Sequence, residues 1–209
     1  MKKQLIIGLT GQTGSGKSTV SRCLISEGLA VIDCDRISRE ITYDGSECCK
    51  CLSEHFPACF NCDLHLDRAA LGTIVFSDGE KLELLNRLIF PFILDAINQR
   101  TEELRSQGFE IIVLDAPTLF ESGADKLCDI IVSCISSKNI RAERIIARDG
   151  ITREQAENRI DSQLPDSFYR EHSDIVIENS GGIKALENAS RFISHILKGR
   201  SYGNQKEKA

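Results

Sequence analysis

The chain has 209 residues and a formal net charge of -5 at pH 7. This length predicts one domain, residues 1–209, with room for an insertion. The acidic balance argues against a non-specific nucleic-acid binder, and no apolar run reaches the roughly 20 residues that a membrane span needs. The N-terminus also lacks the apolar core of a signal peptide. We therefore expect a cytoplasmic monomer that binds neither nucleic acid nor membrane.

The first elements form a strand, a glycine-rich loop and a helix. The apolar run Leu5–Thr10 predicts a buried strand. The loop Gly11–Gly16 follows, and a helix is expected over Lys17–Glu27, with Gly28 as its C-terminal cap. Ala30–Asp33 predicts the second strand.

A long helical region comes next. Apolar residues recur at helical spacing between Leu82 and Ile89, and Pro91 is expected to interrupt the helix. The turn-forming residues of 56–67 predict a loop. We expect residues 36–108 to form a helical substrate-binding insertion.

The second half of the chain alternates between strands and helices. Strands are predicted at 111–115, 130–133 and 174–178, and helices at 138–148, 153–163 and 183–197. Thr152 and Gln155 form a capping-box pattern at the start of one helix. This alternation predicts a three-layer α/β fold whose five-stranded parallel sheet binds ligands at the carboxyl ends of its strands.

One motif carries a specific chemistry. Gly11-Gln12-Thr13-Gly14-Ser15-Gly16-Lys17-Ser18 matches the phosphate-binding loop pattern G-x-x-x-x-G-K-[ST]. Glycines let the backbone N–H groups point inward around an anion, and the helix N-terminus adds positive potential. Lys17 can reach the β- and γ-phosphates of ATP, and the Ser18 hydroxyl can ligate Mg²⁺. The flanking strand and helix indicate a P-loop kinase rather than a chance glycine-rich turn.

Three aspartates follow the predicted strands. Asp33 and Asp35 end the second strand, where one of them could accept a proton from a substrate hydroxyl or hold Mg²⁺ through water. Capping a helix explains them equally well. Asp115 ends the third strand and could lie near Mg²⁺ or simply form a polar turn before Pro117.

Three arginines share one face of a predicted helix. Arg141, Arg144 and Arg148 are spaced so that they could neutralise charge on a transferring phosphoryl group. A solvated face is the alternative, and Glu143 or Asp149 could pair with them.

Five of the nine cysteines fall close together, between Cys48 and Cys62. Cys59 and Cys62 have zinc-ligand spacing, but the usual second pair is missing. We expect reduced thiols, no stoichiometric zinc and no required disulfide.

Several separated segments together resemble one family. They are Gly8–Gly11 leading into Gly14–Thr19, Val31–Asp35, Leu66–Leu71 with Val75-Phe76, Asp115–Glu121, Arg144 with Arg148–Gly150, Gln163–Pro165 and Val176–Gly181. In this order and spacing they resemble the dephospho-CoA kinase family from about Leu5 to Leu197. The resemblance implies a substrate-binding insertion, a helical lid at residues 138–166, and transfer of phosphate from Mg²⁺-ATP to the ribose 3′-hydroxyl of dephospho-CoA, the last step of CoA synthesis.

The resemblance also implies roles for individual residues. Catalytic roles fall to Asp35 as base and to Lys17, Arg144 and Thr10. ATP-binding roles fall to Gly11, Thr13, Gly14, Ser15, Gly16, Lys17, Ser18, Thr19, Arg148 and Asn179. Acceptor-binding roles fall to Asp33, Arg68, Asp115 and Leu119. Ser18 is the implied Mg²⁺ ligand.

Three positions depart from the family pattern. Phe90 stands where the family usually has histidine, so a polar substrate contact is either lost or dispensable. Thr118 replaces an apolar residue, and Gln12-Thr13 replaces the common Gly-Ile at variable loop positions.

Two other functions remain as alternatives. A nucleoside monophosphate kinase would share the P-loop but not the segment beginning at Asp115. A GTPase switch would need guanine-reading and switch motifs that the sequence lacks, since Asp115 is followed by Ala-Pro-Thr.

Overall fold

The structure, a computed structural model, describes residues 4–203, with side chains described as far as residue 199. The strands are β1 (Leu5–Gly11), β2 (Ala30–Asp33), β3 (Ile111–Asp115), β4 (Ile130–Ile135) and β5 (Ile175–Glu178). The α-helices are α1 (Lys17–Ser26), α2 (Cys34–Glu40), α3 (Glu47–His55), α4 (Arg68–Phe76), α5 (Gly79–Ser106), α6 (Lys138–Asp149), α7 (Arg153–Asp161), α8 (Asp166–His172) and α9 (Ile183–Gly203). Two short 3₁₀ helices are η1 (Pro57–Cys59) and η2 (Ala124–Leu127).

The chain divides into two compact units. Unit 1 comprises Met1–Ile32 and Glu103–Ala209, and unit 2 comprises Asp33–Glu102. Unit 2 contains most of the predicted insertion, and its boundaries lie a few residues earlier than the predicted 36–108.

The sheet has the strand order β2-β3-β1-β4-β5, so the first strand is also the central one. β1 pairs in parallel with both β3 and β4, and β4 pairs in parallel with β5. The central position of β1 buries its apolar run from both sides: Ile7 and Leu9 have no exposed surface. This confirms the predicted five-stranded parallel α/β sheet.

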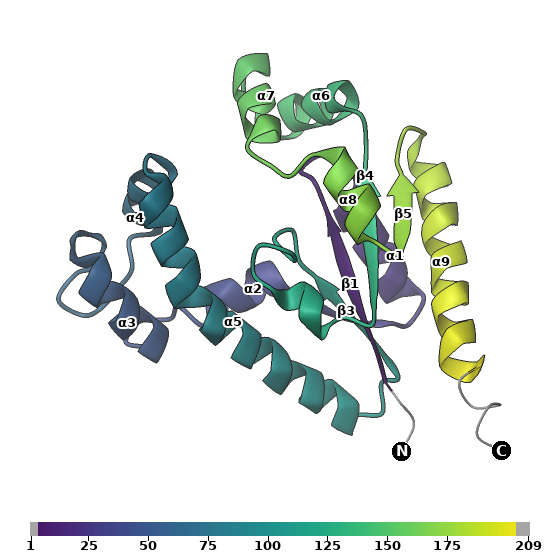
Figure 1. Cartoon of the computed structure of the whole chain (residues 1–209), viewed down its shortest axis with the longest axis horizontal. Coiled ribbons are helices and arrows are strands. Elements are labelled where there is room, and N and C mark those ends of the chain that lie inside the picture. The colour runs from purple at the N-terminus through teal and green to yellow at the C-terminus, as the bar shows by residue number, and fades with distance from the viewer. Residues whose placement is uncertain (1–3, 204–209) are drawn as a thin grey trace. The chain divides into compact units, whose positions relative to one another are not determined.

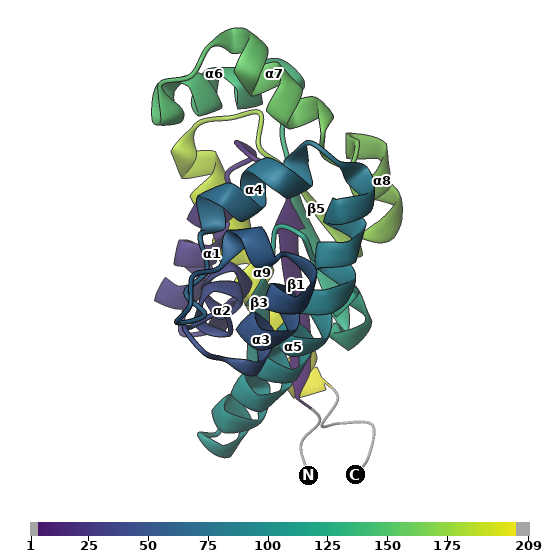
Figure 2. The same ribbon diagram turned by 90° about the vertical axis from the view of Figure 1, so that its left-hand side faces the viewer.

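Helices cover both faces of the sheet. The apolar faces of α1 and α9 pack into one core with β1, β3, β4 and β5 through residues such as Val20, Leu24 and Leu197. The short helix α8 contacts β4, and Figure 2 shows α8 and α1 on opposite sides of the sheet. In Figure 1, α6 and α7 lie beyond the ends at which β1 and β4 terminate. The layers therefore leave the carboxyl edge of the sheet to the loops and to α6.

Unit 2 has a core of its own. Apolar side chains of α3, α4 and the first half of α5 meet there, with Leu52, Phe56 and Val75 among the most buried. The predicted loop at 56–67 holds η1 and one antiparallel bridge between Phe60 and Leu66.

Pro91 does not interrupt α5, which contradicts the expectation from the sequence. The helix runs without a break from Gly79 to Ser106 with Pro91 inside it. Pro91 and Arg87, whose carbonyl would have accepted the missing N–H, both lie on the exposed side of α5. Water can therefore satisfy that carbonyl, while the opposite face of the helix packs in the core of unit 2.

Candidate active site

The P-loop of unit 1 has a backbone conformation at three positions that residues other than glycine rarely adopt. The φ angles of Gly11, Gly14 and Gly16 are 146°, 76° and 107°. A Cβ atom at Gly11 would lie 2.2 Å from the carbonyl oxygen of Cys134, and one at Gly16 would lie 2.5 Å from Nδ2 of Asn179. The glycines of the motif are thus required both by conformation and by close neighbours.

Lys17 and Asp115 meet at the carboxyl edge of the sheet. Nζ of Lys17 forms an ion pair with Oδ1 of Asp115, and each side chain is 14 % exposed. Close by in the chain, the Thr10 hydroxyl donates to the carbonyl of Pro117 at 3.3 Å, which ties the end of β1 to the segment after β3. The structure thus brings together the predicted residues Thr10, Lys17 and Asp115.

Arg144 contacts the P-loop directly. Its Nη1 donates to the carbonyl oxygens of Gly14 at 3.1 Å and Ser15 at 3.3 Å. Nδ2 of Asn179 donates to the same Ser15 carbonyl at 2.7 Å. Two residues predicted separately from the sequence therefore converge on one peptide of the loop.

The variable positions of the loop are anchored to the segment after α7. Nε2 of Gln12 donates to the carbonyl of Leu164 at 2.9 Å, and the backbone N–H of Thr13 donates to Oε1 of Gln163 at 2.9 Å. The sequence pointed to both segments but not to their contact, because residues 150 apart carry no local signal of pairing. Gln12 is 3 % exposed, so its amide is a buried part of the loop's support.

A pocket of about 280 Å³ opens beside the P-loop. It is lined by Gly16, Thr19, Arg144, Asn179, Gly181, Gly182, Ile183 and Leu186. The lining combines apolar surface with a few polar groups, as small-molecule sites usually do.

The three arginines of α6 have three different environments. Arg141 is 4 % exposed, and its Nε donates to the carbonyl of Ser136 at 2.9 Å. Burial lowers the pKa of its guanidinium. Arg144 is partly buried, while Arg148 is exposed and pairs with Asp149 at 2.7 Å. A uniformly solvated face is therefore excluded, and the predicted pairing with Asp149 is confirmed.

Asp33 and Asp35 belong to unit 2. The Asp33 carboxylate caps α2 by accepting the N–H of Arg36 at 3.0 Å. Asp35 lies in the first turn of that helix, and both aspartates are exposed. The capping role, left open by the sequence, thus belongs to Asp33.

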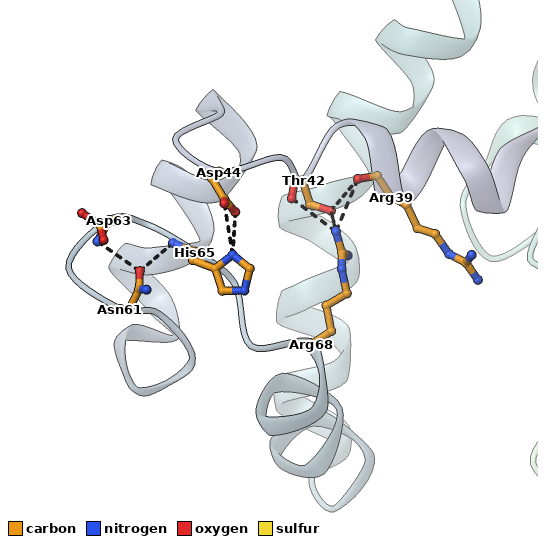
Figure 3. A network of polar contacts seen from close by, with 7 residues as sticks. All are labelled: Arg39, Thr42, Asp44, Asn61, Asp63, His65 and Arg68. Atoms are coloured by element: carbon orange, nitrogen blue, oxygen red, sulfur yellow. Dashed lines mark hydrogen bonds and ion pairs between the residues drawn. The ribbon is translucent and has the colours of Figure 1, made fainter.

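Arg68 attaches the start of α4 to the segment that ends α2. Its Nη2 donates to the Thr42 hydroxyl at 2.6 Å and to the carbonyls of Thr42 and Arg39 at 3.2 and 3.3 Å. Figure 3 shows this network beside the hydrogen bond between Nδ1 of His65 and the Asp44 carboxylate, at 2.9 Å. Arg68 therefore braces the helix that carries Asp35.

Other predicted residues are placed as follows. Ser18 is exposed in the first turn of α1 and Thr19 is partly buried. Leu119 has no exposed surface, and its Cδ2 lies 2.6 Å from where a Cβ on Gly8 would be. The proposed contact of Leu119 with substrate stays a prediction.

All nine cysteines are free thiols. Burial raises the pKa of Cys48 and of Cys134 to about 11. Within residues 4–203, no group of three or more His, Cys, Asp or Glu side chains is placed to hold a metal ion. Over the same range, no helix is long and apolar enough to cross a membrane.

A parallel sheet with a phosphate-binding loop after its central strand, and an arginine from a neighbouring helix on that loop, defines a P-loop kinase. The family model for dephospho-CoA kinase matches residues 5–185. The chain therefore belongs to the dephospho-CoA kinase family, which makes it an ATP-dependent kinase of coenzyme A biosynthesis.

Individual relatives agree with the family match. The dephospho-CoA kinase of Parasynechococcus marenigrum is 40 % identical over 182 residues, which cover 86 % of this chain and 90 % of that protein. A crystal structure of a Thermus thermophilus protein is 32 % identical, with a TM-score of 0.78 over 94 % of this chain and 99 % of that one. Dephospho-CoA kinase from Campylobacter jejuni has a TM-score of 0.69 at 26 % identity, over 93 % and 98 % of the two chains. These likenesses favour this family over the nucleoside monophosphate kinases and GTPase switches.

Proposed function

We propose that the chain transfers the γ-phosphoryl group of Mg²⁺-ATP to the ribose 3′-hydroxyl of dephospho-CoA, giving coenzyme A and ADP. The observation that carries this proposal is the family match over residues 5–185, which includes an intact P-loop with Lys17 at its end. The roles proposed for individual residues rest on the family resemblance together with their contacts.

Lys17 is held ready for the phosphates by Asp115. The ion pair keeps the ammonium group at the carboxyl edge of the sheet. When ATP binds, the Lys17 ammonium group turns from this carboxylate to the β- and γ-phosphate oxygens, or contacts both.

The oxygen donors near the loop fit Mg²⁺. This ion prefers hard oxygen ligands and keeps several waters, so it needs only one or two protein groups besides the phosphates. The exposed Ser18 hydroxyl would hold the ion, with the Asp115 carboxylate as a second oxygen group nearby. Bound there, Mg²⁺ neutralises charge on the phosphate oxygens.

The arginines of the lid contribute positive charge to the transferring group. Arg144 leaves the carbonyls of Gly14 and Ser15 for phosphoryl oxygens, which are stronger acceptors because they are ionised. Arg148 assists from the exposed end of α6. The pocket lined by Thr19 and Ile183 receives the adenine base.

Asp35 orients the acceptor hydroxyl and takes its proton as the phosphoryl group moves. Asp33 caps α2 with its carboxylate, and the likeness of Val31–Asp35 to the family pattern is what assigns the base to Asp35. Arg68 supports Asp35 indirectly by holding the end of α2.

The compartment and oligomeric state are part of the same proposal. Nine free thiols suit a reducing compartment, so we place the protein in the cytoplasm. We also propose that it works as a monomer on ATP and dephospho-CoA, without nucleic acid or membrane.

An ADP-release assay with dephospho-CoA, AMP, CMP and shikimate tests the activity. We expect dephospho-CoA to have the highest kcat/KM, and a better AMP or CMP acceptor would overturn the substrate assignment. Asp35→Asn should lower kcat by about 10²–10⁴ with little change in ATP affinity. Asp33→Asn is the matched control, because asparagine also caps helices well; if it is inactive while Asp35→Asn is nearly normal, the two carboxylates have the opposite roles.

A further inference from the structure

The carbonyl oxygen of Ser15 receives hydrogen bonds from three different elements of unit 1. Nδ2 of Asn179, just after β5, donates at 2.7 Å. Nη1 of Arg144 on α6 and the Sγ thiol of Cys134 on β4 each lie at 3.3 Å. The bond from Asn179 is the shortest of the three, so this side chain contributes most to fixing the carbonyl.

The backbone of Asn179 is itself held at both ends. Its N–H donates to the carbonyl of Ile135 at 2.8 Å, and its carbonyl accepts the Ser136 hydroxyl at 2.7 Å. The residue is 5 % exposed. Because its partner is a carbonyl, the side-chain atom facing Ser15 must be the amide nitrogen, which is the donor.

A fixed carbonyl also fixes the N–H on the other side of the same peptide. In a planar trans peptide the C=O and N–H bonds point in opposite directions. Holding the Ser15 carbonyl toward Asn179 therefore directs the Gly16 N–H the other way. Inward-pointing N–H groups are what makes such a loop bind phosphate.

This peptide needs an external anchor because Ser15 lies between two glycines. Gly14 and Gly16 have φ angles of 76° and 107°, and glycine reaches φ values of either sign at little cost. The absent Cβ of Gly16 also leaves the room that the Asn179 amide occupies, since a Cβ there would lie 2.5 Å from Nδ2. The loop and its anchor are thus fitted to each other.

The other two donors cannot replace Asn179 during the reaction. A thiol is a weak hydrogen-bond donor, and burial, which raises the pKa of Cys134 to about 11, keeps this group a neutral thiol. In the proposed mechanism Arg144 leaves the loop for the phosphoryl group. Asn179 is then the main anchor of the Ser15 carbonyl.

We propose that Asn179 is a positioning residue that acts through the Ser15–Gly16 peptide, holding a phosphate-binding N–H in place rather than reading the nucleotide base. This inference rests on the proposed ATP site and assigns Asn179 a part in polyphosphate binding. It makes no use of the acceptor, so a binding experiment tests it independently of the identity of the acceptor.

The test compares ligands with and without a base. Calorimetry would give Kd for ATP, GTP and inorganic tripolyphosphate, each with Mg²⁺, on the full chain. Asn179→Leu keeps the side-chain size and adds no charge but removes the donor, and Asn179→Ala is the second variant should leucine disturb the fold. We expect all three ligands to bind more weakly by a similar factor of about 3–10, the size of one hydrogen bond.

Two controls bracket this result. Ile183→Ala, in the pocket wall, should weaken ATP and GTP but leave tripolyphosphate unchanged. Asn188→Leu, on the exposed side of α9, should change none of the three. The inference is overturned if the Asn179 variants keep wild-type affinity for tripolyphosphate. A fall in ATP affinity alone would show that Asn179 reads the base, and unchanged affinity for all three ligands would show that it has no part in binding.

Discussion

Replacing Gly11 by alanine tests whether the close approach of β1 and β4 requires glycine at the start of the P-loop. Gly11 is the last residue of β1 and is paired with Cys134 of β4. An added Cβ would lie 2.2 Å from the Cys134 carbonyl oxygen, a backbone atom that cannot rotate away. The ends of β1 and β4 must therefore separate.

The cost can be worked out from its parts. A φ angle of 146° in a residue other than glycine costs on the order of 1–3 kcal/mol. Separating the strand ends adds about 1–3 kcal/mol of overpacking, and a strained or lost ladder hydrogen bond adds about 1 kcal/mol. The sum, about 3–7 kcal/mol, is a large part of the roughly 5–15 kcal/mol that stabilises a typical domain.

Gly28→Ala is a matched control. Gly28 has a φ angle of 84°, but nothing lies within 4 Å of a Cβ built on it. Its variant should lose only the conformational term, about 1–2 kcal/mol. Urea unfolding monitored by circular dichroism gives both losses. Equal unfolding midpoints for the two variants would refute the reasoning, because the clash with Cys134 would then have no energetic effect.

Three further predictions concern charge and protonation. Lys17→Ala should abolish turnover and leave the circular dichroism spectrum intact; near-normal turnover would remove Lys17 from the phosphate site. Arg144→Ala should lower kcat by about 10²–10³ and Arg148→Ala by less, and steady-state kinetics showing the reverse order would exchange their roles. Burial raises the pKa of Cys134 from 9.0 to about 11, so the folded state favours the thiol. The contribution of the Cys134 thiol to stability is constant below pH 9 and is lost as pH rises toward 11, by no more than about 1.4 kcal/mol per pH unit. Plots of melting temperature against pH for the wild type and Cys134→Ala should therefore converge or cross between pH 9 and 11. Parallel plots would contradict this prediction.

The sequence predicted those features whose signals are local. The strand of Leu5–Thr10, the P-loop and the helix after it are contiguous, and the structure confirms them as β1, the loop and α1. The capping box of Thr152 and Gln155 is also present at the start of α7. In each case the residues that carry the signal are the residues that form the structure.

Other features depend on contacts that the sequence does not encode locally. The continuity of α5 through Pro91 depends on which side of the helix faces water. The short helix α8 begins after Pro165 and buries Tyr169, but its seven residues give too little periodicity to predict it. The anchoring of the Ser15 carbonyl by Asn179 joins residues 164 apart in the chain. Only the assembled sheet brings such groups together.

Arg144 and Arg148 lie on the same helix but have partners of different charge. Arg148 makes two hydrogen bonds to Asp149, at 2.7 and 2.8 Å, and these raise the pKa of its guanidinium. To reach a phosphate it must give up a charged partner for another, which leaves little net gain. Arg144 instead contacts two neutral carbonyls, at 3.1 and 3.3 Å. In the proposed mechanism, exchanging them for ionised phosphoryl oxygens would strengthen both hydrogen bonds, so we expect the energetic drive toward the transferring group to act mainly on Arg144. Because these carbonyls belong to the P-loop, the proposed exchange would also shift the support of that loop onto Asn179.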